Sequence, residues 1–541
     1  MKKFLFSFPA LCISVLSFAQ YPLVKQWDYR FGGNGQDQLY TLIQTNDGGY
    51  LLGGSCRSDS TFDVSQPNRG GSDFWIVKTD GDGMKQWDRR YGGSGDEVIL
   101  ATLKNSDGGY LLVGSSTSGI GGEKTEPNWD LSNYTYDYWV VRIDSLSNIL
   151  WDHRYGGTSN DYAYTAYQAT NGAYLIVGTS QSDSNGDKTE PSWGDWDCWI
   201  IKIDSGGNKL WDKRYGGTLF DAAYDVAACS DGGCLIGGMS ASGVSGDKTE
   251  PSWGGTDYWI VKIDSQGSKQ WDKRYGGTGN ENLRATTLTY DNGFILGGWS
   301  DSDSSGDKTN FNWGGLDFWI VMIDSEGNKI WDRNYGGTNH EDELKSIVRT
   351  SGNHYMIAGT SYSVASGDKT ENNLGQEQTW VLNIAANGDK VWDETLQTDC
   401  NLTDDEIGVA IQSGDGCYVM ANYTVAGVGG DKTQPNWPYA DYWMIKFCDT
   451  TLATTQQNLS NSSYAMISPN PFSGSATLLL HDAPGKNSCF YLYDIYGKKR
   501  MQLVIQNPET KIQQAGLTSG IYFYEIREMR YITASGKIII E

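Results

Sequence analysis

The chain has 541 residues, of which 38% are hydrophobic and 20% charged, so it is globular and long enough for two to four domains. Sixty-eight glycines and 69 aromatic residues (21 Trp, 33 Tyr and 15 Phe) favour many short strands joined by tight turns. The formal net charge of −24 excludes nucleic acid and anionic membrane surfaces as general partners, because an acidic surface repels phosphate. With only four histidines, we expect no multi-histidine metal centre.

The N-terminal segment predicts export. Residues 1–19 place two lysines before a short apolar run and end in Ser17, Phe18 and Ala19, the pattern of a secretory signal peptide. The apolar run is shorter than the ~20 residues that a membrane-spanning helix needs, and no later segment is apolar enough to span. We therefore expect a mature protein that begins near residue 20 and has no transmembrane segment.

Two series of tryptophans divide the middle of the chain into seven repeats. Spacings of 60 to 64 residues separate the members of each series, which indicates stacked supersecondary units. The first series is Trp27, Trp87, Trp151, Trp211, Trp271, Trp331 and Trp392, and the second is Trp75, Trp139, Trp199, Trp259, Trp319, Trp380 and Trp443.

One repeat shows the organisation of the unit. Strand-like runs at 221–229, 234–240, 257–264 and 269–275 are joined by short turns that contain glycine, which predicts a four-stranded antiparallel meander. The third run is apolar on both faces and should be covered on both sides, and the small residues of the first suit a crowded position near an axis. Repeated four-stranded units buried on both faces are typical of a β-propeller.

The ends of the repeat region predict how the ring is completed. The chain enters with a fourth-strand sequence, QWDYRFGG from Gln26, and the last repeat stops after a third strand at 441–447. Joining these pieces makes a seventh blade and leaves no open sheet edge. We predict an all-β, seven-bladed propeller over residues 20–448, closed by the N-terminal strand. Its D-x-W-[IV]-[VI]-[KR]-[IL]-D pattern resembles bacterial propeller repeats of the delta-sixty kind, a resemblance that implies a fold and no activity.

Six of the seven long loops contain Gly-[Asp/Glu]-Lys-Thr, on the face that we expect to carry every long connection. A structural role as a turn and cap explains six copies around a ring. The alternative is calcium bound by one loop, because alternating oxygen ligands converge on a hard cation; the candidate ligands are Asp183, Asn185, Asp187 and Glu190.

Two further sets of side chains are candidates for contact with a ligand. Tryptophans of the long loops could stack on sugar rings, or could pack beside their own blades; they are Trp129, Trp193, Trp253, Trp313 and Trp437. Carboxylates that begin the first strands could form an acidic ring at the axial mouth and supply a glycosidase pair, or could simply cap turns; they are Asp96, Glu97, Asp161, Asp221, Glu281, Glu341, Asp342, Asp404 and Asp405.

The cysteines allow one local pairing. Eight remain after signal-peptide cleavage, in an oxidising compartment. Cys229 and Cys234 flank a four-residue hairpin loop and could form a disulfide across it, whereas Cys56, Cys198 and Cys400 are expected to be packed thiols. We find no nucleophile motif, phosphate-binding loop or zinc spacing.

The C-terminal region has a different composition. Residues 449–463 are a polar linker, and residues 464–541 contain short apolar strands between Pro, Gly and Asn turns, which predict a small antiparallel β-sandwich. The motifs SPNPF (468–472), YDIYGKKR (493–500), LTSGIYFYEI (517–526) and GKIII (536–540) resemble the type A C-terminal sorting domain of type IX secretion in Bacteroidota. The resemblance implies recognition by that secretion machinery and delivery to the medium or the outer-membrane surface.

These observations lead to three functional hypotheses. The first is an exported binding or structural module that has a glycan or protein ligand and no cofactor. The second is a carbohydrate-active enzyme, a hydrolase or lyase, that uses carboxylates at the axial mouth. The third is a calcium-stabilised adhesin.

Overall fold

The computed structural model describes residues 23–449 except 133, 339–341 and 400–407, and residues 465–540 except 469–471, 481–487, 495–497, 515 and 529–530. The predicted signal peptide and nearly all of the predicted linker lie outside these described residues. The chain divides into two compact units, residues 1–448 and 449–541. All regular elements of the described residues are β-strands.

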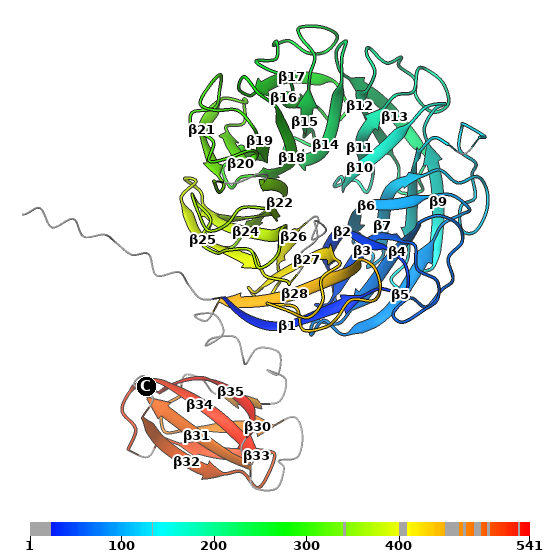
Figure 1. Cartoon of the computed structure of the whole chain (residues 1–541). Helices are drawn as coiled ribbons and strands as arrows, with labels where there is room; N and C mark the ends of the chain where they lie inside the picture. The colour runs from blue at the N-terminus through cyan, green and yellow to red at the C-terminus, as the bar shows by residue number, and fades with distance from the viewer. Residues whose placement is uncertain are drawn as a thin grey trace, which may run out of the picture. The chain divides into compact units, whose positions relative to one another are not determined.

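The first unit contains seven four-stranded antiparallel sheets arranged as a ring, here called blades 1 to 7 (Figure 1). This confirms the predicted propeller architecture. In chain order the blades are: blade 1, β2 (Asp37–Gln44), β3 (Tyr50–Cys56), β4 (Asp73–Thr79) and β5 (Lys85–Tyr91); blade 2, β6 (Glu97–Lys104), β7 (Tyr110–Ser116), β8 (Asp137–Ile143) and β9 (Ile149–Tyr155); blade 3, β10 (Asp161–Gln168), β11 (Tyr174–Ser180), β12 (Asp197–Ile203) and β13 (Lys209–Tyr215); blade 4, β14 (Asp221–Ala228), β15 (Cys234–Ser240), β16 (Asp257–Ile263) and β17 (Lys269–Tyr275); blade 5, β18 (Glu281–Leu288), β19 (Phe294–Ser300), β20 (Asp317–Ile323) and β21 (Lys329–Tyr335); blade 6, β22 (Asp342–Thr350), β23 (His354–Ser361), β24 (Gln378–Ala385) and β25 (Lys390–Leu396); and blade 7, β26 (Val409–Gln412), β27 (Tyr418–Thr424), β28 (Asp441–Asp449) and β1 (Leu23–Phe31).

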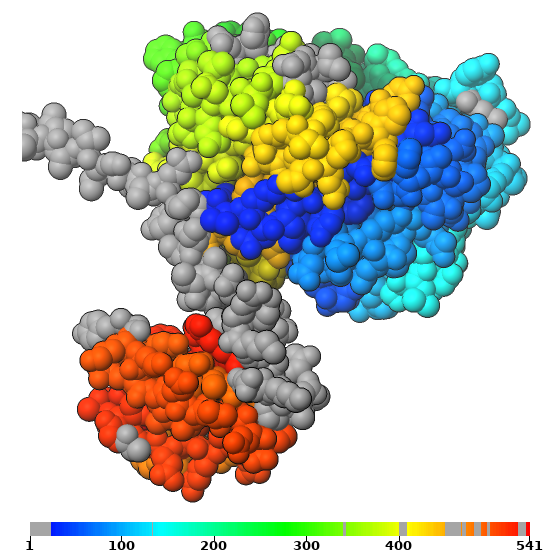
Figure 2. All heavy atoms as spheres, turned by 60° about the horizontal axis from the view of Figure 1, so that its bottom comes forward, coloured from blue at the N-terminus to red at the C-terminus, as the bar shows by residue number. Residues whose placement is uncertain are grey.

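The two ends of the first unit meet in blade 7. The strand order there is β1-β28-β27-β26, so the N-terminal strand is the outer strand of the last blade, as predicted. Figure 2 shows β1 in blue against the yellow and orange residues of blade 7. In Figure 1 the first strand of each repeat lies nearest the axis, and the fourth lies at the rim.

The apolar core is divided among the blade interfaces. Each of seven hydrophobic clusters draws its buried side chains from two neighbouring blades, and one of them joins blade 7 to blade 1. The third strand is covered on both sides: all seven residues of β16 are buried, which agrees with its apolar character on both faces. The second tryptophan series occupies this strand, and all seven of its indoles are at most 2% exposed.

The long loops and the blade-to-blade connections lie on one face of the ring. The loop of blade 4 reaches the connection that precedes it, where the backbone N of Asp247 donates to the carbonyl O of Gly216 at 2.8 Å. The corresponding contact joins Asp187 to Gly156 and Asp307 to Gly276. This face, here called the long-loop face, therefore carries every long connection of the described blades.

The second unit is a sandwich of two antiparallel sheets around one core. One sheet has the order β29-β30-β33 and the other β32-β31-β34-β35. Phe490, Leu492, Ile512 and Ile538 are buried between them. The strands are β29 (Ala465–Ser468), β30 (Ser475–Leu480), β31 (Ser488–Asp494), β32 (Lys499–Val504), β33 (Glu509–Gln513), β34 (Gly520–Glu528) and β35 (Tyr531–Ile540).

Candidate ligand-binding face

The lysine of each Gly-[Asp/Glu]-Lys-Thr motif is a buried structural group. Lys248 is 2% exposed, and its Nζ donates to the Ser242 carbonyl and the Ser252 hydroxyl, each at 2.7 Å. Burial lowers the pKa of Lys248 to about 8, although Asp257 and Asp221 oppose this effect. The motif glycine Gly246 has a φ of +56°, which a residue with a Cβ rarely adopts. These contacts support the structural interpretation of the motif.

The threonine of the motif ties the loop to the outer strand of its own blade. The backbone N and the hydroxyl of Thr249 donate to the two carboxylate oxygens of Asp272, both at 2.9 Å. Asp272 also accepts a hydrogen bond from the buried indole of Trp259. The Asp of each W-D pair therefore fixes a loop and a core tryptophan together.

The acidic residue of the motif connects neighbouring blades. Asp247 accepts a hydrogen bond from Arg214 of the preceding blade at 3.0 Å, and Asp307 accepts one from Arg274 at 2.7 Å. Arg274 in turn lies over the loop indole of its own blade, with its Cζ 4.8 Å from the ring centroid of Trp253. The Trp253 Nε1 donates to Asp307 at 3.2 Å.

This tryptophan, arginine and carboxylate, which we call the Trp–Arg–Asp unit, recurs around the long-loop face. Trp129 with Arg154 and Asp187, and Trp193 with Arg214 and Asp247, repeat the arrangement, with cation–π distances of 4.5 and 4.7 Å. The indoles are held in place, yet they are not buried. Trp129, Trp193, Trp253 and Trp313 remain 42%, 52%, 53% and 49% exposed, so the alternative in which they pack fully beside their blades does not hold.

Trp437 of blade 7 is different from these four. Arg30 lies 4.2 Å from its ring centroid on one side, and the ring of Phe62 stacks on it at 3.6 Å between centroids. The indole is half-buried, and Phe62 is 59% exposed. At this position the aromatic surface offered to solvent belongs mainly to Phe62.

Most of the described carboxylates that begin the inner strands cap turns and do not form an open acidic ring. The carboxylates that begin six inner strands are fully buried: Asp37, Glu97, Asp161, Asp221, Glu281 and Asp342. Asp221 accepts hydrogen bonds from the backbone N of Gly217 (2.6 Å) and the hydroxyl of Ser242 (2.8 Å). Glu281 accepts from the backbone N of Gly277 and the hydroxyl of Ser300, which lies opposite it in the register (both 2.8 Å). Asp221 and Glu281 are therefore caps of the blade-to-blade turns and not ligand-face residues.

The remaining candidate carboxylates at the strand starts differ in their surroundings. Asp96 is partly exposed and pairs with Arg57 at 3.0 Å. Glu341, Asp404 and Asp405 lie outside the described residues. Burial raises the pKa of Asp161 to about 6, even though two serine hydroxyls and the Gly157 N–H hydrogen-bond to it. A buried carboxyl of this kind is a folding element whose charge is costly unless it is hydrogen-bonded.

The structure does not bring the four calcium candidates together. Asp187 pairs with Arg154 at 2.5 Å, and Glu190 pairs with Lys213 at 3.0 Å. The Asn185 side-chain O accepts from the backbone of Thr158, and Asp183 lies exposed at the surface. No group of three or more His, Cys, Asp or Glu side chains suited to a metal ion occurs among the described residues. Asp187 and Glu190 are instead engaged in ion pairs, the first with the preceding blade and the second within blade 3.

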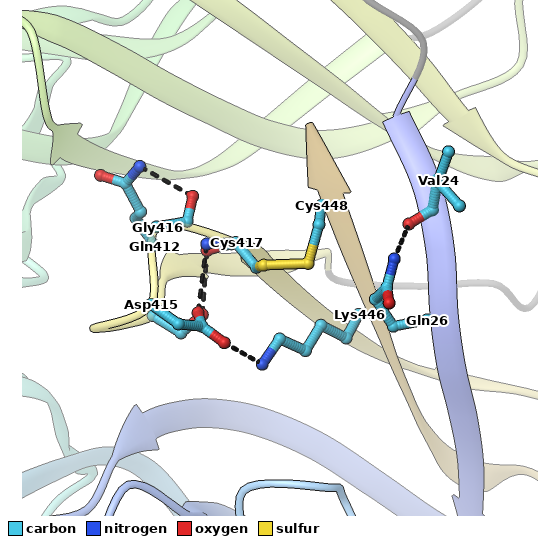
Figure 3. The surroundings of a disulfide bond; sticks show 9 residues. Val24, Gln26, Gln412, Asp415, Gly416, Cys417, Lys446 and Cys448 are labelled. Atoms are coloured by element: carbon cyan, nitrogen blue, oxygen red, sulfur yellow. Dashed lines mark hydrogen bonds and ion pairs between the residues drawn. A yellow bond between two sulfur atoms is a disulfide. The ribbon is translucent and has the colours of Figure 1, made fainter. Parts of the chain in front are cut away.

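The disulfide of the propeller is not the predicted one. Cys229 and Cys234 are both free. Cys234 lies directly opposite Ala228 in the register, so Cys229, the next residue of the chain, directs its side chain to the other face of the sheet. Cys417 and Cys448 form a disulfide next to the ion pair of Asp415 with Lys446 (Figure 3). The register of blade 7 pairs Tyr418 with Phe447, which makes Cys417 and Cys448 direct neighbours.

The alignment of the sequence repeats contains a signal for this disulfide. In blade 3 the equivalent pair is Tyr174 with Ile203, so residues 173 and 204 are neighbours across the second and third strands. Aligning the repeats by their third strands would have placed the two cysteines of blade 7 opposite each other.

Comparisons with known proteins agree with the two-unit organisation. A family model described as the secretion system C-terminal sorting domain matches residues 466–541. The regulatory protein FlaEY of Caulobacter vibrioides is 29% identical over 193 residues, a match that covers 34% of this chain and 20% of that protein. The chain thus matches about a fifth of the length of this relative.

Solved structures with similarity to the chain include β-propellers. The WD40 domain of Pan2 from Neurospora crassa aligns with a TM-score of 0.39 and 8% identity, over 75% of this chain and 88% of that one. The polysaccharide lyase Uly1 aligns with a TM-score of 0.41 and 11% identity, over 76% and 89%. Likenesses at this level assign no activity.

No helix of the described residues is long and apolar enough to cross a membrane. The sandwich fold of the second unit and the family match agree with the motifs found in the sequence. Residues 466–541 are a C-terminal sorting domain of type IX secretion, and the chain is an exported protein with a β-propeller-like fold.

Proposed function

We propose that this exported protein is a binding module whose ligand contacts the long-loop face of the propeller. The observation that supports it is the exposure of the loop indoles in three copies of the Trp–Arg–Asp unit. In the third strands the indoles are at most 2% exposed, whereas those of Trp129, Trp193 and Trp253 are 42–53% exposed.

The units also hold each indole in one orientation before a ligand arrives. An arginine lies against the ring and a carboxylate of the next blade binds that arginine, as for Trp193 with Arg214 and Asp247. A side chain that is already ordered loses little conformational entropy on binding, and exposed aromatic rings are frequent anchors of sugars and of partner proteins. Asp221 and Glu281, two of the carboxylates considered for the enzyme hypothesis, are fully buried, which favours the binding module.

The proposal is tested by binding of the full chain to a glycan array and to an array of immobilised peptides. We expect at least one class of ligand to bind, and the Trp193→Ala/Trp253→Ala variant to lose at least tenfold in affinity at an unchanged melting temperature. The matched control is Leu210→Ala, which removes an equally exposed apolar side chain from the rim of blade 3. The proposal would be overturned if the full chain bound to neither array, or if its binding were unchanged in the double variant.

A further inference from the structure

Blade 5 departs from the Trp–Arg–Asp unit at one residue. Trp313 and Asp368 are retained, and the Trp313 Nε1 donates to Asp368 at 2.9 Å. The outer-strand position that holds Arg274 in blade 4 holds Asn334 here. The register is the same, because Trp319 lies opposite Asn334 as Trp259 lies opposite Arg274.

The shorter side chain leaves a cavity of about 570 Å³, whose lining includes Trp313, Asn334, Asp368 and the neighbouring Phe311. This volume lies within the range of small-ligand sites, about 300–1,000 Å³. The Asn334 amide N donates to Asp317 at 2.6 Å and to the Phe311 carbonyl at 3.2 Å, so it is held away from Asp368. Phe311 is 74% exposed at the rim of the cavity.

The indole and the carboxylate at this cavity correspond to the groups that hold a guanidinium in blade 4. The lining also includes Arg333, whose Cζ lies 5.7 Å from the ring centroid of Trp331. In blade 4 the Arg274 guanidinium lies 4.8 Å from the Trp253 ring centroid and 2.7 Å from Asp307. In blade 5 the ring and the carboxylate remain without their arginine. Lys390 lies at the rim of the cavity, where its Nζ donates to the backbone carbonyl of Asp368. Lys329 makes the same contact with Asp307, and the Asp307 carboxylate still binds Arg274. A lysine in this place is therefore compatible with a bound cation.

The hydrogen-bonding character of the cavity also favours a donor-rich group. The buried side-chain O of Asn334 has no hydrogen-bond partner among the described residues, and Asp368 can only accept when it is ionised. A guanidinium has five N–H donors and no acceptor, and it stacks well on an indole. A sugar hydroxyl lacks the positive charge that the carboxylate binds in the other blades.

We propose that Trp313, Asn334 and Asp368 form an arginine socket, which binds the guanidinium of an arginine side chain presented by a basic segment of a partner protein. The inference rests on the proposed function, in that it names one ligand class for the long-loop face. The formal net charge of −24 favours the approach of a basic partner. Phe311 offers an apolar surface for the residues that flank the arginine.

The test compares two immobilised ten-residue peptides that differ in one side chain, a central arginine or its neutral isostere citrulline. We expect the full chain to bind the arginine peptide at least tenfold more tightly in low salt, and the difference to shrink as salt is added. Asn334→Arg should fill the socket with the chain's own guanidinium and abolish the preference at an equal or higher melting temperature. Arg274→Asn, the reverse substitution, should open a second socket at Trp253 and about double the peptide bound at saturation.

Equal binding of the two peptides, or an arginine preference that persists in Asn334→Arg, would overturn the socket. If Asn334→Arg does not fold, the two peptides are compared on the unaltered chain and on Asp368→Asn. The arginine preference should be present in the first and lost in the second, because the proposal requires both the charge of the ligand and that of the carboxylate. Failure of the socket is distinct from failure of the proposed function, because that test uses Trp193 and Trp253 and leaves blade 5 unchanged.

Discussion

The indole Nε1 of Trp443 donates a hydrogen bond to the carboxylate of Asp28 over 3.1 Å, joining residues 415 positions apart. The same bond, at 3.0 to 3.2 Å, occurs within each of the other six blades between the third-strand tryptophan and the Asp of the W-D pair. Asp28 also accepts from the backbone and hydroxyl of Thr433. The contact that organises every blade therefore also attaches the N-terminal strand to blade 7.

Replacing Asp28 should weaken this attachment. In Asp28→Ala the buried indole and the Thr433 backbone lose their acceptor, and Lys25 loses its ion pair, so we expect the free energy of unfolding to fall by about 3 kcal/mol. Urea unfolding measures the change. The control Asp82→Ala lies in an exposed turn and should stay within about 0.5 kcal/mol. Equal effects of the two substitutions would contradict a special role for Asp28.

The buried lysine of the repeated loop motif should matter through its hydrogen bonds. Lys248→Met keeps the length of the side chain but removes the donor to Ser242 and Ser252, and we expect a loss of about 2–4 kcal/mol in the free energy of unfolding. Lys273→Met provides the comparison, because Lys273 is 36% exposed and pairs with Glu250 at 3.3 Å. That surface pair should contribute at most about 1 kcal/mol. A similar loss in both variants would argue against the structural role of the motif.

The disulfide of blade 7 should stabilise the propeller by restricting the unfolded chain. Cys417 and Cys448 are 31 residues apart, for which the loop-entropy relation predicts about 3–4 kcal/mol. We expect Cys417→Ala/Cys448→Ala to lower the melting temperature, and a reductant to lower that of the unaltered chain to a similar value. The double variant should not respond to the reductant. A reductant effect that persists in the double variant would point to another disulfide.

Glu394 should make stability depend on pH. Burial, followed by the neighbouring carboxylates of Glu371, Asp431 and Asp393, raises its pKa to about 8. Between its ordinary value near 4.5 and pH 8 the folded chain keeps a proton that the unfolded chain releases, so the free energy of unfolding should decrease as pH rises through this window. Glu394→Gln removes the titrating group and should reduce that decrease. Chemical unfolding at pH 5, 6.5 and 8 measures it, and identical pH slopes in the two proteins would refute the assignment.

Much of the architecture follows from the sequence because a repeated pattern reports a repeated environment. The second tryptophan series marks the strand that is buried on both faces, and the split of the meander between residues 26 and 447 indicates how blade 7 is assembled. The local motifs of the C-terminal region were sufficient to identify the sorting domain. These features depend on periodicity and on short-range turn chemistry, which a linear sequence displays directly.

The roles of the candidate site residues depended on the tertiary structure. The sequence places Asp221 and Glu281 at strand starts, but whether a carboxylate faces the axis or a turn depends on which backbone N–H groups lie within reach of it. Asp187 and Glu190 have the spacing of calcium ligands, yet their partners Arg154 and Lys213 come from other strands. Pairings between strands set these distances, and Arg154, the partner of Asp187, comes from the preceding repeat.

The sequence by itself determined the repeat, the blade count, the C-terminal sorting domain and the face that carries the long loops. Only the tertiary structure decided that four loop indoles remain about half exposed and that a cavity lies beside Trp313 and Asn334. The physical reason is that strand periodicity is a local property of the chain. Exposure and cavities arise where side chains from different blades meet.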